Sequence, residues 1–166
     1  VHAEALEHAA KALLRRYGVM CRKLLPREQL APSWRELLPI YRAAEARGDI
    51  RGGRFVEPLG GEQFALIEAV EELRRLRRHK ETDEWVALAA ADPLNLANVL
   101  DEGQRPVAAG NRRLVFRNGE AVAAQTPAGV AWLAQLDPTA QRQAAALLAP
   151  EERGDPRPRQ RGWWRR

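Results

Sequence analysis

The sequence of 166 residues contains one cysteine, three histidines and no long apolar run. A single cysteine, Cys21, excludes an internal disulfide, and three scattered histidines do not supply the closely spaced ligands of a zinc site. We therefore expect no bound metal. No segment reaches the roughly 20 apolar residues that cross a bilayer, and no signal-peptide pattern is present. These absences favour a cytoplasmic protein without membrane contact.

A phosphate-binding loop of the form Gly-x-x-x-x-Gly-Lys-Ser/Thr is also missing, and with it the usual means of holding ATP. We therefore expect this chain to bind no nucleotide cofactor and to hydrolyse no ATP by itself. The sequence begins at Val1, inside a predicted helix and without a methionine. We expect it to be a piece of a longer protein.

The sequence carries an excess of positive charge, which is distributed unevenly along the chain. The formal net charge is +5, made up of +5 in residues 1–80, −3 in residues 81–150 and +3 in residues 151–166. Basic surfaces attract polyanions such as nucleic acid. The first half of the chain and the tail are therefore the parts expected to face nucleic acid.

Two helices are predicted in the first 30 residues. Apolar side chains recur at helical spacing over residues 3–17, and Gly18 is placed to end that helix. A shorter helix is expected over residues 20–28, where Pro26 should disturb or truncate it.

The strongest local signal in the chain belongs to a third helix, over residues 33–47. Ser33 followed three residues later by Glu36 is the capping-box pattern, and Gly48 is placed to end the helix. Pro39 should kink it or loosen one turn. Its buried stripe is formed by Trp34, Leu37, Leu38 and Tyr41.

Gly52 and Gly53 stand between short β-prone stretches, which predicts a tight hairpin at the two glycines. A short strand at 64–66 follows, and then a fourth helix over 67–79 whose inward side chains would be Val70, Leu73 and Leu76. Three helices followed by a hairpin are the order of a winged-helix domain, which presents its recognition helix to the DNA major groove. We assign that role to residues 33–47, and the wing to the glycine hairpin.

Several short strands are predicted after residue 84. The clearest is a hairpin of residues 113–117 and 120–124 around Asn118-Gly119, the strongest two-residue turn signal. Asp137 as N-cap, followed by a proline in the first turn, begins a last helix that ends at residue 149. The other predicted elements are strands at 85–90, 107–109 and 130–133 and a short helix up to Leu100.

The predicted fold class is therefore α+β. A winged-helix domain at residues 1–80 is followed by a small β-barrel-like domain with a C-terminal helix at residues 81–150. The tail, residues 151–166, is rich in Pro, Arg and Trp, and a composition of this kind predicts a flexible segment.

Six short stretches resemble the C-terminal region of the large helicase-related (Lhr) family of bacterial superfamily 2 DNA helicases. In the first half they are LLRRYGV, WRELLP, EARGDIRGGRFV and GEQFAL, at residues 13–19, 34–39, 45–56 and 61–66. In the second half they are ADPLNL and AGNR, at residues 91–96 and 109–112. Their order along the chain is that of the family.

The resemblance implies an ATP-dependent helicase that moves 3′ to 5′ on single-stranded DNA in DNA repair, with ATP and Mg²⁺ bound by a motor upstream of this chain. It also implies tandem winged helices and a β-barrel similar to those of bacterial DNA glycosylases, and glycosylase activity on uracil-containing DNA is attributed to such regions. The implied partners are DNA and the upstream helicase domains of the same chain. The oligomeric state is left open.

Six basic side chains near the predicted recognition helix and wing are candidates for DNA contact. Arg35 and Arg42 fall outside the apolar stripe of the helix, where they would reach phosphates or base edges. Arg51 and Arg54 flank the two glycines, and arginine can grip a phosphate with two hydrogen bonds. Each also has a plainer interpretation as a solvated surface side chain. The full set is Arg22, Lys23, Arg35, Arg42, Arg51 and Arg54.

Other candidates carry a structural and a functional interpretation side by side. Trp34 would stack on a base, a contact of about 1–3 kcal/mol, or lie in the core, which its place on the apolar stripe favours. The basic run at residues 74–80 would follow a phosphate backbone, contact another domain or form a solvated helix face. Trp163 and Trp164, which stand between arginines, would stack on single-stranded bases or dock onto the longer protein.

No catalytic residue stands out in the sequence. A glycosylase requires a fixed carboxylate next to the flipped base, and the two candidates are Asp92 and Asp155. Asp before Pro, as at Asp92, more commonly caps a helix or forms a turn. Asp155 lies in the tail, where a carboxylate is poorly positioned for chemistry.

These observations predict a DNA-binding accessory module of a repair helicase, which orients DNA for a motor that this chain lacks. One alternative is a share in a DNA (uracil) glycosylase site formed with further winged-helix domains. Another is a structural module for docking or oligomerisation, which the acidic balance of residues 81–150 favours for that half of the chain.

Overall fold

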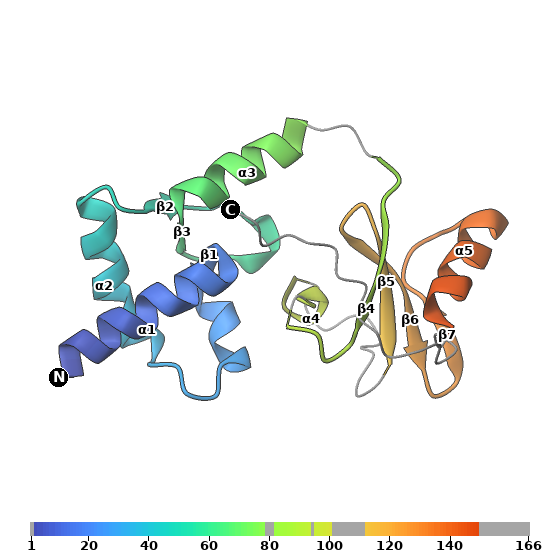
Figure 1. The fold of residues 1–166 in the computed structure, drawn as a ribbon, viewed down its shortest axis with the longest axis horizontal. Coiled ribbons are helices and arrows are strands. Elements are labelled where there is room, and N and C mark those ends of the chain that lie inside the picture. The colour runs from blue at the N-terminus through green and yellow to red at the C-terminus, as the bar shows by residue number, and fades with distance from the viewer. Residues whose placement is uncertain (1, 79–81, 94, 101–111, 150–166) are drawn as a thin grey trace, which may run out of the picture. The chain divides into compact units, whose positions relative to one another are not determined.

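The structure is a computed structural model that describes residues 2–78, 82–93, 95–100 and 112–149 (Figure 1). The chain divides into two compact units. The first comprises residues 1–84 and 93–105, and the second comprises residues 85–92 and 106–166. Within the described ranges, no helix has both the length and the apolar character needed to cross a membrane.

The first unit is a small three-stranded sheet with helices on its two faces. Its strands are antiparallel, and the strand that comes last in the sequence lies in the middle, in the order β1-β3-β2. The elements are α1 (His2–Tyr17), β1 (Val19–Cys21), the 3-10 helix η1 (Arg22–Arg27), α2 (Trp34–Ala46), β2 (Arg51–Gly53), the 3-10 helix η2 (Glu57–Leu59), β3 (Gln63–Ala65), α3 (Ile67–Arg78) and α4 (Ala97–Leu100).

Glycines end both α1 and α2, as the sequence predicted. Gly18, with φ of 70°, donates its N–H to the carbonyl of Leu14 at 2.8 Å and closes α1. After α2, Gly48 has φ of 82° and bonds Glu45, while the N–H of Asp49 reaches the carbonyl of Ala44 at 3.0 Å. This pair of bonds is the Schellman motif, which favours glycine because the backbone is left-handed there.

The capping box predicted at the start of α2 is present. The Glu36 carboxylate accepts hydrogen bonds from the backbone N–H of Ser33 at 2.9 Å and from its hydroxyl at 2.6 Å. The helix continues past Pro39 to Ala46. The proline therefore does not end α2, although it removes one backbone donor from it.

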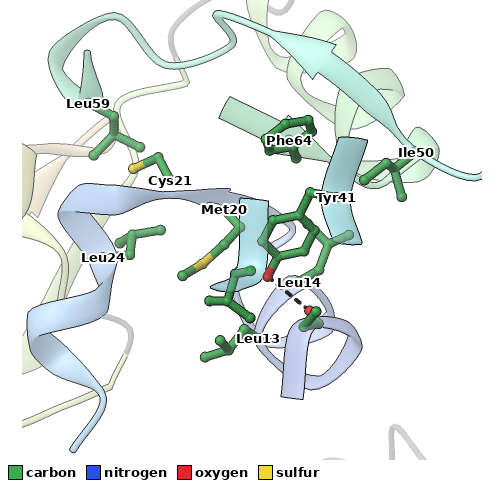
Figure 2. Close-up of a cluster of buried hydrophobic side chains, with 11 residues drawn as sticks. Leu13, Leu14, Met20, Cys21, Leu24, Tyr41, Ile50, Leu59 and Phe64 are labelled. Carbon is green, nitrogen blue, oxygen red and sulfur yellow. Dashed lines mark hydrogen bonds between the residues drawn. The ribbon is translucent and has the colours of Figure 1, made fainter. Parts of the chain in front are cut away.

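The core of the first unit is built around two stacked aromatic rings (Figure 2). The rings of Tyr41 and Phe64 lie 5.3 Å apart between centroids, and the buried hydroxyl of Tyr41 donates to the carbonyl of Ala10 at 3.0 Å. This bond ties α2 to α1, so the two helices have a fixed relation to the sheet. Aliphatic and sulfur-containing side chains complete the cluster, namely Leu13, Leu14, Met20, Cys21, Leu24, Leu37, Ile50 and Leu59.

Three sequence predictions for this unit were wrong. The second helix begins later than expected, because Met20 and Cys21 are buried in strand β1 and only a 3-10 helix follows. The tight turn expected at Gly52 and Gly53 is absent from the structure, since both glycines belong to β2. Leu76, expected to face inward, is 54% exposed near the end of α3.

The wing of the first unit is therefore the longer loop of residues 54–62, which joins β2 to β3 and contains η2. Leu59 of η2 packs into the core beside η1. The wing is thus held against the domain along part of its length rather than formed by a two-residue turn.

The second unit is a four-stranded antiparallel sheet, in the order β4-β5-β6-β7, with one helix packed on it (Figure 1). Its elements are β4 (Trp85–Ala89), β5 (Arg113–Arg117), β6 (Glu120–Thr126), β7 (Gly129–Trp132) and α5 (Pro138–Leu148). The predicted turn is confirmed, because Asn118 and Gly119 both have positive φ. Among the described residues the sheet is open, with β4 and β7 at its edges, rather than closed into the expected barrel.

Helix α5 is held on the sheet by small side chains and by polar contacts at its ends. Ala123 and Ala144 are fully buried between sheet and helix. Asp137 caps the helix, as predicted, by accepting from the N–H groups of Thr139 and Ala140 at 2.8 and 3.0 Å. At the other end, the side-chain amide of Gln125 donates to the carbonyl of Leu148.

The boundary between the units differs from the division that the sequence predicted at residue 80. Strand β4 belongs to the second unit, but the chain after it returns to the first. There the partly buried side chains of Leu96, Val99 and Leu100, around α4, pack against the core that contains Leu24 and Leu59. The strand predicted at 107–109 and the tail from residue 150 lie outside the described residues.

Candidate nucleic-acid interface

The outward face of α2 carries two of the predicted DNA contacts. Arg35 and Arg42 are seven residues apart, which places them on the same side of the helix two turns from each other. Both are exposed, and so is Pro39 between them. The buried residues of α2, Leu37 and Tyr41, lie on the other side. The sequence prediction that this face is free of the apolar stripe is therefore confirmed.

Arg42 is held by an acidic residue of the wing. Its Nε and Nη2 donate to the two carboxylate oxygens of Glu62 at 3.2 and 3.1 Å. The hydrogen bonds and the charge of Glu62 raise the pKa of Arg42 further above its ordinary value. Both side chains are exposed, at 60% and 41%, so the pair is accessible to solvent and to a competing anion. In this state the charge of Arg42 is largely balanced.

Lys23 contacts the wing from η1. Its Nζ donates to the backbone carbonyl of Pro58, in η2, at 2.9 Å. Arg22, which precedes it, is exposed at the start of η1. The two neighbouring cations thus differ, because Lys23 is hydrogen-bonded to the wing whereas Arg22 faces solvent.

Strand β2 and the beginning of the wing carry the other two candidates. Arg51 is exposed, and its guanidinium lies 3.4 Å from the carbonyl of Gly48. Arg54 is exposed at the first position of the wing. Between them, Gly52 faces the carboxylate of Glu45, where a Cβ atom would come within 2.3 Å of an oxygen. A side chain at position 52 would therefore require Glu45 to move.

Gln63 fixes the course of the wing, and the sequence offered no signal for this role. Its side chain is fully buried. The amide oxygen accepts from the N–H groups of Phe55 and Val56, each at 2.9 Å, and the amide nitrogen donates to the carbonyl of Val56 at 2.8 Å. These three bonds set the direction in which the chain leaves β2, and with it the position of the adjoining Arg54.

Trp34 contacts the core rather than standing free on the surface. Its ring is partly buried, with its centroid 6.0 Å from that of Tyr41 and 6.3 Å from that of Phe64. These contacts agree with the core interpretation. A base could stack only on the part of the ring that remains exposed.

Of the two candidates for catalysis, only Asp92 lies among the described residues, and it belongs to the second unit. Asp92 is partly buried in the turn after β4, where its N–H donates to the carbonyl of Ala89 at 3.0 Å. Asp155, Trp163 and Trp164 lie outside the described residues, as does the end of the basic run at 79–80. In the part of the chain that is described, no group of three or more His, Cys, Asp or Glu side chains could hold a metal ion.

Comparison with known families identifies the first unit. Residues 2–85 match the family model described as the winged-helix domain of large helicase-related protein. The match covers β1 to β3, the wing and α2, and therefore all six basic candidates.

Two curated proteins are similar to the chain along an alignment of 90 residues, which covers 52% of the chain. The Lhr helicase/uracil glycosylase of Escherichia coli (strain K12) is 37% identical over that stretch. The Lhr helicase/probable uracil glycosylase of Mycolicibacterium smegmatis is 36% identical. In both cases the matched stretch is 6% of the relative's length. The chain thus corresponds to a small part of these proteins.

Proposed function

Because this chain belongs to the winged-helix domain family of large helicase-related proteins, we propose that its first unit binds the phosphate backbone of DNA and orients the DNA for a helicase motor elsewhere in the longer protein. ATP and Mg²⁺ would be bound by that motor. The contribution of this chain is to hold the duplex or its junction with a single strand. Phosphate contacts fix the register and orientation of a protein on DNA without reading its sequence.

The observation that carries the proposal is a set of exposed arginines along α2 and the wing. Arg35 and Arg54 are exposed and have no hydrogen-bond or ion-pair partner among the described residues. Arg51 lies between them in the sequence, and among the described residues its partners are backbone carbonyls alone, at 3.4 Å and 3.5 Å. Arginine in this state can form paired hydrogen bonds with phosphate oxygens.

The test is a triple variant of the full chain, R35Q/R51Q/R54Q, in a binding titration with fluorescent duplex DNA at several salt concentrations. Each lost phosphate contact should weaken binding on all sequences and lower the slope of log K against log salt by about 1. We therefore expect a slope smaller by about 3 and a large loss of affinity at low salt.

The matched control is K11Q/R15Q/R47Q, which removes the same charge from the same unit. These three cations line a groove between α1 and α2 instead of the outward face of α2. The control should keep most of the affinity and slope. If both triple variants bind DNA as the unchanged chain does, the proposed contact through α2 and the wing is wrong. If they lose affinity equally, binding depends on net charge alone and the assignment to α2 and the wing is wrong.

The names of the two relatives favour one second function, a share in a uracil glycosylase site. Asp92 is the described carboxylate that would serve it. The test is incubation of the chain with uracil-containing DNA, followed by alkaline cleavage at abasic sites. Cleavage that disappears in D92N would establish the chain as catalytic. Cleavage that is absent, together with salt-dependent binding, would favour the accessory role.

A further inference from the structure

Helix α3 and the start of the wing pack against the same face of the small sheet. Val70 of α3 is buried in a cluster with Val19 and Ala65 from the sheet. The same cluster receives Leu73 from the next turn of α3, and Phe55 and Val56 from the start of the wing. The first half of α3 and the start of the wing therefore pack on one cluster.

The last two turns of α3 carry four arginines, of which one is paired. Arg75 forms an ion pair with Glu72 three residues earlier. Arg74, Arg77 and Arg78 are exposed and have no partner among the described residues. With about 100° per residue in an α-helix, these three fall within about 100° of one another around the axis, and Arg75 lies outside that sector.

The unpaired arginine face begins one turn beyond the residues of α3 that pack with the start of the wing. Arg77 follows Leu73 by four residues and therefore lies on the same side of the helix, one turn further on. Leu73 packs in the cluster that contains Phe55, and Arg54 directly precedes Phe55 in the wing. Cations thus occur next to contact residues in both elements, at Arg54 beside Phe55 in the chain and at Arg77 one turn after Leu73.

The helix dipole offers a simpler explanation for arginines at the end of α3. Cations near the C-terminus interact favourably with the helix dipole, and this effect accounts for basic residues in the last turn. It does not depend on which face they occupy, so it leaves the grouping of the three unpaired arginines beside the wing unexplained. Leu76 remains 54% exposed in the same turn, so the described chain does not cover this end of α3.

We propose that Arg74, Arg77 and Arg78 form a second phosphate-binding surface, which continues the surface of α2 and the wing onto the DNA backbone that flanks the primary contact. The inference rests on the proposed function of the first unit. The three residues span about 6 Å along the helix axis, and duplex DNA presents a charge about every 1.7 Å. Several phosphates of a flanking segment would therefore lie within reach of this face.

The experiment compares R74Q/R77Q/R78Q with the unchanged chain on two duplexes, one of about 10 base pairs, a single helical turn, and one of about 30 base pairs. On the short duplex the two proteins should bind equally, because the primary contact occupies it. On the long duplex the variant should bind about tenfold more weakly, with a salt slope smaller by about 2 to 3.

Two further variants make the result specific. R75Q removes one charge from the same helix outside the arginine face and should bind the long duplex as the unchanged chain does. R74K/R77K/R78K keeps the charge and should retain most of the affinity, since lysine also contacts phosphate. Thermal unfolding midpoints equal to that of the unchanged chain would show that all of these variants are folded.

The outcomes separate this inference from the proposed function. Equal binding of R74Q/R77Q/R78Q and the unchanged chain to the long duplex would overturn the second surface and leave the contact through α2 and the wing in place. Such a result would assign the arginine face to a protein partner or to solvent. Loss of affinity on both duplexes would also overturn it, because α3 would then be part of the primary contact. Failure of R35Q/R51Q/R54Q to weaken binding to either duplex would overturn the proposed function itself.

Discussion

The two units of this chain build their cores from side chains of different size. In the first, large residues such as Tyr41, Phe64 and Met20 are fully buried between the small sheet and the helical segments around it. In the second, the aliphatic side chains of Val115 and Leu148 are fully buried, together with the small side chains of Ala123 and Ala144 where α5 meets the sheet. Large side chains fill a wide space between packed elements, whereas alanines allow a helix to approach a sheet closely.

The arginines of the two units differ as well. In the second unit Arg117 lies over the ring of Trp85, 5.0 Å from its centroid, and Arg142 contacts the carbonyl of Pro138 at 3.2 Å. In the first unit Arg35 and Arg54 are exposed and have no partner among the described residues. The first unit also holds paired arginines, such as Arg16 with Glu28 and Arg42 with Glu62. It therefore combines arginines that support local structure with arginines that remain available for an external anion.

The largest effect should come from removing an aromatic ring of the first unit. Phe64→Ala empties the centre of the cluster, and such a change costs about 3–5 kcal/mol of the free energy of unfolding. Hydrogen exchange should show loss of protection in α1, α2 and β3. Amides of β5 and β6 should keep theirs if the units unfold separately, and equal loss in both sheets would show that they unfold together.

The next largest effect on the free energy of unfolding should come from replacing a glutamine, and it should be larger in the first unit than in the second. Gln63→Leu leaves two N–H groups and a carbonyl at the base of the wing without their partner, at a cost of about 3 kcal/mol. Gln125 is only partly buried and bonds Arg113 and Leu148, so Gln125→Leu should cost about 1 kcal/mol. Chemical denaturation measures both. A smaller cost for the buried glutamine would contradict its role at the wing.

The second unit should be sensitive to added volume instead. Ala123→Leu inserts three heavy atoms where sheet and helix are in contact, and overpacking of this kind costs about 1–3 kcal/mol. Ala146→Leu is the matched control, because position 146 is exposed on α5. Denaturation monitored through α5 should show a lower midpoint for the first variant only. Equal midpoints would mean that the alanine contact is loosely packed.

Acid should weaken the first unit through Glu28. Burial opposes ionisation of this carboxyl, but hydrogen bonds from Tyr17 and Arg16, at 2.8 and 2.7 Å, outweigh burial and lower its pKa from the usual 4.5. A lowered pKa in the folded state stabilises the fold above the unfolded pKa, and this contribution is lost as the pH falls through the folded pKa. Thermal melts from pH 6 downward should therefore fall more steeply for the unchanged chain than for Glu28→Gln.

In the second unit, the carboxyl of Asp137 should make stability depend on acid in the same direction. Bonds from the N–H groups of Ala140 and Thr139 lower the pKa of this carboxyl as well. It is an exposed cap, so we expect a smaller acid effect there. A steeper acid dependence in α5 than in α1 would reverse the order of the two units.

The smallest predicted effect concerns the Arg42–Glu62 pair. Glu62→Gln removes a negative charge from the wing and releases Arg42, so DNA affinity should rise by about threefold, in line with the modest energy of exposed ion pairs. The double variant R42Q/E62Q should lose that gain. Unchanged or lower affinity in Glu62→Gln would show that Arg42 makes no contact with DNA.

Several elements of both units could be predicted because their signals are local. Ser33 and Glu36, Asn118 and Gly119, and the cap at Asp137 each act within a few residues, and all were found where the sequence placed them. The same reasoning failed at Gly52 and Gly53, because glycines in a turn and glycines facing a neighbouring side chain look alike in a sequence. Only the approach of Glu45 distinguishes the two cases.

The sequence by itself determined the family, the ends of the main helices and the excess of positive charge in the first half, since each depends on composition or on neighbours along the chain. The tertiary structure decided which of those charges are free. The Arg42–Glu62 pair joins residues 20 positions apart, and the contact of Lys23 with Pro58 spans 35. Pairings over such distances depend on how helices, sheet and wing pack together, and for that reason no local pattern revealed them.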